Sequence, residues 1–215
     1  SVLLKKIAAE KAQLIKDGKI KKEKPLPEIT DEEKPFELPS GWEWAKLGGL
    51  ADFQKGYAFK SEEYLDSGQM ITKIQNLTEN SIENSVYIAR DRASEFEQYI
   101  LLEGDIVMTT VGSWFSAPLS AVGRSFLINK LFDNSLLNQN AVRLRFSKGL
   151  NPIYLLTHLK SLIFKSYFIS IFFEIVNFVK PKIFFIRINT KWIDYYNNNK
   201  QKIIAIKNLV KDIKL

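Results

Sequence analysis

Apolar residues near the start of the chain recur at helical spacing. Leu4, Ile7 and Leu14 share one face with Leu3, Ala8 and Ile15, while lysines and glutamates fill the other face. Gly18 and the basic residues after it suit a helix C-terminus. The pattern predicts an amphipathic spacer helix within residues 1–24. Its stripe needs a packing surface, and two alternatives are open: the chain's own domain or a partner helix.

A second apolar stripe lies at the other end of the chain. Ile203, Ile206, Val210 and Ile213 are spaced three, four and three residues apart, which is heptad-like spacing. We therefore predict a C-terminal amphipathic helix over residues 199–215. The two terminal helices are expected to pack together as a coiled coil, within one chain or between two copies.

Between the helices the pattern is mixed. Prolines keep residues 25–40 extended as a tether, and residues 41–198 form the expected globular domain. Short strands are predicted at residues 70–74, 85–89, 105–110, 117–128 and 140–145, and helices at residues 61–65, 94–97 and 152–167. The predicted fold class is α+β: a domain with a twisted β-sheet and short helices, flanked by long amphipathic helices.

Composition narrows the setting. Apolar residues make up 46% of the 215 residues, which indicates a folded chain. The absence of cysteine excludes disulfides and thiolate metal sites, and favours the reducing cytoplasm. Lys5, Lys6 and Glu10 interrupt any signal peptide, and the longest charge-free run of the most apolar region, residues 166–173, is too short to span a membrane.

Charge is distributed unevenly. The net charge is +7, yet residues 1–162 carry 21 basic and 21 acidic side chains. Residues 163–215 carry 10 basic and 3 acidic side chains, and residues 106–162 carry 6 basic side chains against Asp133 alone. Such a distribution either presents a positive face to a phosphate backbone or is a solvated basic surface.

No catalytic residue or metal ligand is predicted. His158 is the one histidine and lies among leucines, where a structural role is expected. The string Asn151-Pro152-Ile153-Tyr154 resembles the Asn-Pro-Pro-Tyr motif of amino-methyltransferases. It also fits a helix start, with Asn151 as N-cap and Pro152 at the first helical position, and this interpretation is preferred. No phosphate-cradling glycine loop is present.

Four turn-like clusters carry side chains suited to nucleic acid. They are residues 54–61, 73–76, 109–114 and 138–140, the last leading into Arg143 and Arg145. Amide side chains pair with adenine, arginine pairs with guanine, and lysine, serine and threonine bind phosphates. Singly, each cluster is also ordinary turn chemistry.

These segments resemble, in order over residues 3–160, the DNA-specificity subunit of Type I restriction–modification systems. The matching strings are LLKKIAAEKAQLIKDGKIKK, KPFELPSGWEWAKLGGL, KGYAFKSEEYLDSG, LLEGDIVMTTVGS and LLNQNAVRL. The resemblance implies about half a subunit, with one target-recognition domain that reads one half of a bipartite double-stranded DNA target. It implies no catalysis and no cofactor on this chain, because S-adenosylmethionine belongs to the partner methyltransferase subunits.

The resemblance also implies partners. Methyltransferase subunits would bind the helices, restriction subunits would join them, and the chain would form a homodimer or pair with another half-subunit in a bacterial or archaeal cytoplasm. The loops would face the major groove, and Arg124, Lys130, Arg143 and Arg145 would mainly anchor phosphates. The predicted DNA contacts are Lys55, Tyr57, Lys60, Lys73, Asn76, Thr110, Ser113, Trp114, Arg124, Lys130, Asn138, Gln139, Asn140, Arg143 and Arg145.

Two other functions remain as alternatives. One is a truncated half-subunit that acts as a protein-interaction module without productive DNA reading. The other, an autonomous methyltransferase or nuclease, is disfavoured by the missing cofactor loop.

Overall fold

The computed structural model describes residues 2–22, 25–31, 34, 37, 38, 40–111, 122–161 and 164. It begins with α1 (Val2–Lys16), which is followed by a turn at Asp17 and Gly18. Gly18 has a positive φ of 69°, and the Lys19 N–H donates to the carbonyl of Leu14 at 2.9 Å, which closes the helix end. The helix is therefore shorter than the predicted 1–24, because the chain turns at this glycine.

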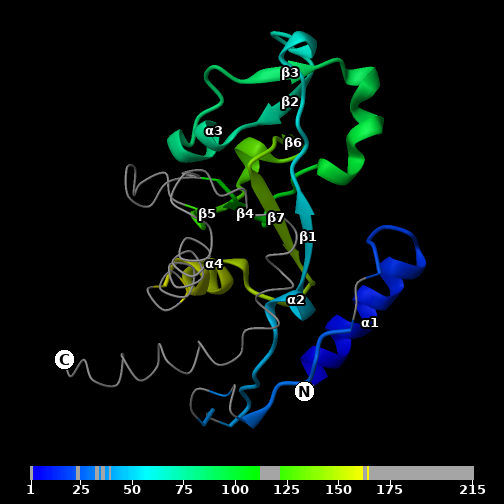
Figure 1. The fold of residues 1–215 in the computed structure, drawn as a ribbon, viewed down its shortest axis with the longest axis vertical. Coiled ribbons are helices and arrows are strands. Elements are labelled where there is room, and N and C mark those ends of the chain that lie inside the picture. The colour runs from blue at the N-terminus through cyan, green and yellow to red at the C-terminus, as the bar shows by residue number, and fades with distance from the viewer. Residues whose placement is uncertain are drawn as a thin grey trace, which may run out of the picture.

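A four-stranded antiparallel sheet forms the centre of the domain (Figure 1). Its strand order is β1-β7-β4-β5. The short helix α2 (Leu47–Leu50) leads directly into the first strand. The strands are β1 (Ala51–Lys55), β4 (Ile106–Thr109), β5 (Ser125–Leu127) and β7 (Ala141–Phe146).

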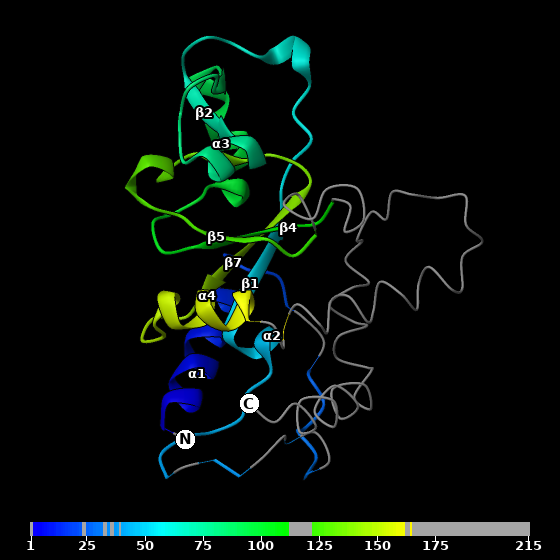
Figure 2. The same cartoon turned by 90° about the vertical axis from the view of Figure 1, so that its left-hand side faces the viewer.

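A smaller sheet of three strands lies beyond one end of the first sheet, together with α3 (Figures 1 and 2). Its order is β3-β2-β6, in which β2 pairs with β3 antiparallel and with β6 parallel. Its elements are β2 (Gln69–Thr72), α3 (Ile74–Glu79), β3 (Val86–Ile88) and β6 (Leu136–Leu137). Three 3-10 helices connect the strands: η2 (Ser61–Glu63), η3 (Arg90–Tyr99) and η5 (Lys130–Phe132).

Strand β7 has both faces covered. On one face Val142 and Leu144 pack with residues of α4 (Pro152–Lys160), among them Leu155. On the other face Ala141 packs in a separate cluster that contains residues of the second sheet. Since successive strand residues alternate between faces, Arg143 and Arg145 share the face of Ala141.

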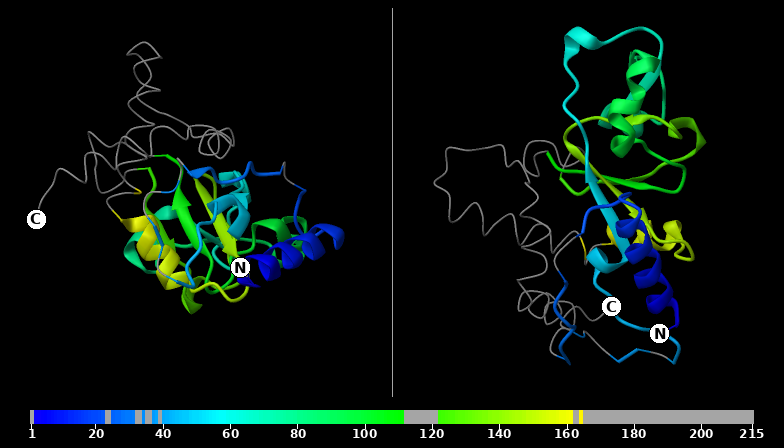
Figure 3. Two further views of the ribbon diagram at one scale, coloured as in Figure 1. Left: turned by 90° about the horizontal axis from the view of Figure 1, so that it is seen from below. Right: turned by 90° about the vertical axis from the view of Figure 1, so that its right-hand side faces the viewer.

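Helix α1 packs on its own domain, the first of the two alternatives. Ile7 is only 2% exposed. The Lys11 ammonium donates to the carbonyls of Gly48 and Ala51 at 2.8 and 2.9 Å, and the Lys148 N–H donates to the Glu10 carboxylate at 3.1 Å. Seen from below, α1 and α4 lie on opposite sides of the sheet's lower end (Figure 3).

The coiled coil stays a prediction. Ile203, Ile206, Val210 and Ile213 lie outside the described residues, as does the whole segment 199–215. The predicted boundary of the globular domain at residue 198 also lies outside them.

The α+β class is confirmed, and each of the five predicted strand segments contains a strand, with corrections at several ends. Ile74 begins α3 instead of ending a strand, because the Asn76 side chain caps the chain at Lys73. Residues 122–124 form a turn where part of a strand was expected, with Gly123 at a φ of 84°. Helix α4 ends at Lys160, before the predicted residue 167, since Ser161 is extended. The predicted helices at residues 61–65 and 94–97 are the 3-10 helices η2 and η3.

Candidate nucleic-acid interface

Polar loops that are distant in sequence meet at one end of the four-stranded sheet. The antiparallel register places Lys55 opposite Val142 and Thr109 opposite Ala141, so β1 and β4 end where β7 begins. Residues 138–140, which connect β6 to β7, lie at the same end of the sheet. We call residues 55–57, 72–73, 109–111 and 138–140 the sheet-end loops.

Four backbone hydrogen bonds join these loops. They involve three of the polar clusters of the sequence and Thr72, the residue directly before the 73–76 cluster. The N–H groups of Gly56 and Tyr57 donate to the carbonyls of Ala141 and Leu137 at 2.9 and 3.0 Å. The Asn138 N–H donates to the Thr72 carbonyl at 3.1 Å. The Thr110 N–H donates to the Asn140 carbonyl at 2.8 Å.

Gly56 allows the closest of these approaches. A Cβ atom at this position would lie 1.9 Å from the Asn138 carbonyl oxygen and 2.5 Å from its carbon. No side chain fits such a gap, and the obstacle is backbone that cannot rotate away. Glycine is therefore required for the 55–57 loop to lie against the 138–140 turn.

The 138–140 turn presents amide side chains to solvent. The Asn138 Oδ1 accepts the Gln139 N–H at 2.8 Å and so stabilises the turn. Asn140 is exposed and has a left-handed φ of 72°. Within the described residues, the side-chain amides of Gln139 and Asn140 have no hydrogen-bond partner, so each offers a donor and an acceptor to a base edge.

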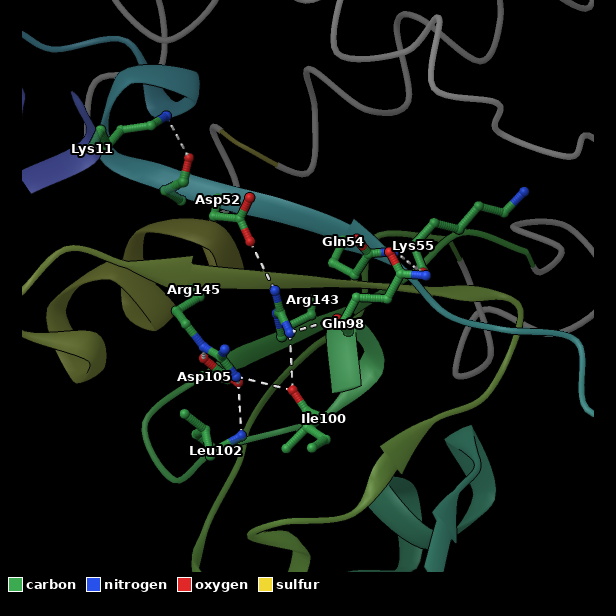
Figure 4. A network of polar contacts seen from close by, with 11 residues as sticks. Lys11, Asp52, Gln54, Lys55, Gln98, Ile100, Leu102, Asp105, Arg143 and Arg145 are labelled. Carbon is green, nitrogen blue, oxygen red and sulfur yellow. Dashed lines mark hydrogen bonds and ion pairs between the residues drawn. The ribbon is translucent and has the colours of Figure 1, made fainter. Parts of the chain in front are cut away.

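Basic side chains border the same loops. The Lys55 side chain points away from the ion-pair network inside the domain (Figure 4). Lys73 follows β2 directly, with its ammonium 3.5 Å from the Asn84 carbonyl. Arg124 lies beside Thr109, whose hydroxyl accepts the Arg124 N–H at 3.1 Å, and its guanidinium stands 5.1 Å from the Phe126 ring centroid. These cations give the sheet-end loops a positive border.

Two predicted lysine contacts lie apart from these loops. Lys60 is exposed at the start of η2. Lys130 begins η5, beyond the far end of β5, and is also exposed. Ser113 and Trp114 lie outside the described residues.

Arg143 is buried inside the domain and only 5% exposed. Its guanidinium donates to Asp52 Oδ2 at 2.8 Å, and to the carbonyls of Gln98 and Ile100 at 3.0 and 2.9 Å (Figure 4). Burial, followed by repulsion from Arg145, lowers the pKa of Arg143 from its ordinary value, while the Asp105 and Asp52 carboxylates oppose that shift. The group stays charged, since an arginine guanidinium does not lose its proton in proteins.

Arg145 forms a two-point ion pair with the buried Asp105. Its Nε donates to Oδ1 at 2.9 Å, and a terminal nitrogen donates to Oδ2 at 2.7 Å and to the Ile100 carbonyl at 2.9 Å. Asp105 also accepts the Leu102 N–H at 2.8 Å. Both arginines were predicted to anchor phosphates. In the structure their guanidiniums bind Asp52, Asp105 and the end of η3, so they are not among the phosphate contacts that we propose.

Asn76 is likewise occupied within the fold. It is 2% exposed. Its Oδ1 accepts the Lys73 N–H at 3.0 Å, and its Nδ2 donates to the Ser81 carbonyl at 3.2 Å. The predicted base contact is replaced by a cap that shapes the loop after α3.

Asp52 and Asp105 were not anticipated from the sequence. A usable signal was present: Arg143 and Arg145 alternate with apolar Val142 and Leu144 in a strand-like run. Two cations on a strand that is covered on both faces require carboxylate partners. The partners lie in β1 and directly before β4, so local sequence does not identify them.

Within the described part of the chain, no three acidic or histidine side chains are grouped in a way that suits a metal ion. No helix among the described residues is long and apolar enough to cross a membrane.

Comparison with known proteins gives one family and two similar curated proteins. The family model for the Type I restriction modification DNA specificity domain matches residues 39–205. The specificity subunit of the Type I restriction enzyme EcoAI from Escherichia coli is 54% identical over 111 residues, which are 51% of this chain and 19% of that protein. The EcoEI specificity subunit, also from Escherichia coli, is 35% identical over 150 residues, 66% of this chain and 24% of that protein. The chain thus spans about a fifth to a quarter of the length of these relatives.

Two solved structures match the chain at lower identity. A chain from a study of complex assembly and conformational transition of the type I R-M system superposes with a TM-score of 0.49 at 16% identity, over 96% of this chain and 48% of that one. The HsdS subunit from Thermoanaerobacter tengcongensis gives a TM-score of 0.44 at 16% identity, over 99% of this chain and 48% of that one.

Proposed function

The chain belongs to the family of Type I restriction modification DNA specificity domains, and we propose that its sheet-end loops read part of a double-stranded DNA target. The observation that carries this proposal is the convergence of three polar clusters and the start of the fourth at one end of the sheet. Sequence readers need a few base-directed groups held rigidly beside phosphate-directed cations, and these loops supply both.

Gln139 and Asn140 are the proposed base readers. Their amides are free of protein partners among the described residues, and an amide pairs with two adjacent atoms of adenine in the major groove. Thr110 lies beside Asn140 and offers a hydroxyl. Asn138 completes the turn, while Ser113 and Trp114 remain predicted contacts.

Lys55, Lys73 and Arg124 are the proposed phosphate contacts of the sheet-end loops. Lys55 is the last residue of β1, Lys73 follows β2 and Arg124 precedes β5, each at a strand end that lies at these loops. The exposed Lys60 and Lys130 lie farther from the turn, and we assign them to the edge of the DNA footprint. Cations of this kind set affinity and register without reading sequence.

We infer that the chain acts without catalysis of its own, as one part of a restriction–modification complex. The curated relatives are specificity subunits of Type I restriction enzymes. Methyltransferase subunits would bind S-adenosylmethionine and restriction subunits would join the assembly. The chain itself would supply the DNA preference.

Selection from a pool of random duplexes tests the proposal. The full chain is expected to enrich one short sequence. Gln139→Ala and Asn140→Ala should each relax the preference at one base pair, because one amide is removed. Lys55→Met should weaken binding to all duplexes alike. Gln13→Ala is a matched control, since this amide lies on α1 and bonds to Asp17.

Equal losses for every duplex with the amide and the lysine variants would contradict the assigned roles. Enrichment that survives both amide substitutions unchanged would place base reading elsewhere on the chain.

A second candidate function is a protein-interaction module. Large apolar side chains are exposed around the start of α4, at the opposite end of β7 from the sheet-end loops. The rings of Trp42 and Tyr154 meet edge to face at 6.3 Å, and Leu3 lies against Gly149 nearby. Capture of a methyltransferase subunit without DNA, lost in Trp42→Ala, would favour this function; capture unaffected by Trp42→Ala would not.

A further inference from the structure

Tyr57 is the one large, exposed apolar side chain of the sheet-end loops in the described part of the chain. Tyr57 is 38% exposed, whereas the other exposed large apolar residues of that part lie outside these loops. Its N–H donates to the Leu137 carbonyl at 3.0 Å, and its backbone pairs with Asn138. The backbone of Tyr57 therefore lies directly beside the amide-bearing turn.

The ring is held in place by other aromatic side chains. Its centroid lies 4.9 Å from that of Phe59, 5.0 Å from that of Phe96 and 5.2 Å from that of Tyr99. Phe59 and Phe96 are buried, so Tyr57 is the outer member of a packed cluster. A ring fixed in this way loses little conformational freedom when a ligand binds.

An apolar ring among base-directed amides suits one group of the DNA major groove. Thymine presents its 5-methyl group there, and this methyl is the apolar feature of the base edges. Stacking of Tyr57 on a base would require an unpaired base, which costs a few kcal/mol in a duplex. The neighbouring amides suit the edges of paired bases.

We propose that Tyr57 reads a thymine by contact of its ring with the 5-methyl group. This inference rests on the proposed DNA-reading function and adds a base and a chemical group to it. The tyrosine hydroxyl has no hydrogen-bond partner within the described residues and plays no part in the contact.

Deoxyuridine substitution tests the contact, because deoxyuridine lacks only this methyl group. Each thymine of the duplex selected by the full chain is replaced singly. At one position the wild-type chain should bind the deoxyuridine duplex about four-fold more weakly than the thymine duplex, because one buried methyl group is lost. Tyr57→Phe should keep this ratio, and Tyr57→Ala should bind both duplexes equally. Both affinities are measured on the same protein sample. A reduced folded fraction therefore affects both equally and does not change their ratio.

The possible results distinguish a failure of the thymine contact from a failure of the proposed DNA-reading function. Failure to select any duplex refutes both. Selection without a deoxyuridine effect at any position refutes only the thymine contact. A penalty that persists in Tyr57→Ala, or disappears in Tyr57→Phe, also overturns it. So does a Tyr57-dependent rise in the fluorescence of 2-aminopurine in the site, because that signal reports an unstacked base.

Discussion

At the scale of single residues, Gly56 fixes the distance between two loops. Gly56→Ala places a methyl group against the Asn138 carbonyl, 1.9 Å from its oxygen, so the 138–140 turn must move. We expect a loss of about 2 kcal/mol in the free energy of unfolding, as for overpacked sites. The preference at base pairs read by Gln139 and Asn140 should broaden. Urea denaturation and duplex selection measure the two effects.

Gly49→Ala is the matched control for this glycine. A Cβ at Gly49 would meet only the Leu26 side chain, at an ordinary 3.7 Å. If Gly56→Ala were as stable and as selective as Gly49→Ala, the close approach of the two loops would not govern the site.

Asp52 neutralises a buried arginine, and its removal should be costly. Asp52→Asn leaves the Arg143 guanidinium with two backbone carbonyls but no carboxylate of its own. We expect a loss of about 3 kcal/mol, at the lower end for a broken buried pair, since Asp52 is partly exposed. Urea denaturation measures it. Glu63→Gln, which breaks an ion pair with Arg92 at the surface, should change stability little, and equal effects would argue against a buried charge.

These residues show why side-chain type alone misassigns roles. Arg143, Arg145 and Asn76 have the chemistry of DNA contacts, and the sequence analysis treated them so. The two arginines are engaged by Asp52, Asp105 and the Ile100 carbonyl, which come from distant parts of the chain. Asn76 is engaged within its own loop. Gln139 and Asn140 remain candidates because their turn projects past the strand ends.

At the scale of elements, Lys11 connects α1 to the start of the sheet through hydrogen bonds. The Lys11 ammonium is shared between the carbonyls of Gly48 and Ala51, at the start of β1. Lys11→Met should speed amide exchange in α1 roughly tenfold, since a hydrogen bond to a charged group contributes about 1.5 kcal/mol. Exchange in β4 and β7 should not change. Hydrogen–deuterium exchange followed by mass spectrometry measures both.

Lys6→Met removes an exposed charge from the same helix and should leave exchange unchanged. Equal protection of α1 in the Lys11 and Lys6 variants would show that the buried Ile7 alone holds the helix.

Element positions followed from the sequence where apolar patterning was strong. The run at residues 106–109 is fully buried and was predicted, as was the Asn151 cap, whose Oδ1 accepts the Ile153 N–H at 2.9 Å. Strand β1 reads Ala-Asp-Phe-Gln-Lys and was missed. Its polar Asp52 forms an ion pair with the buried Arg143, so the strand lacks a clear apolar pattern. Strand β6 has two residues, too few for a period-two signal.

At the scale of the whole molecule, the domain has two chemically different ends. Amides and cations lie at the sheet-end loops, while exposed Trp42, Ile153 and Tyr154 lie near the start of α4. The sequence supplied the polar clusters but not their convergence, because the order β1-β7-β4-β5 joins strands that are far apart in the chain. Local patterns carry no information about that order.

The chemical difference between the two ends of the domain predicts which lysines govern the salt dependence of DNA binding. Each lysine that contacts a phosphate releases a counterion on binding, so its loss should flatten the slope of log affinity against log salt by about 0.9. Lys55→Met and Lys73→Met should each do so, because both lysines lie at the sheet-end loops. Lys148 follows the opposite end of β7, and Lys148→Met should leave the slope unchanged. Fluorescence anisotropy over a salt series measures the slopes, and a change with Lys148→Met as large as with Lys55→Met would mean that DNA does not bind at one end of the sheet.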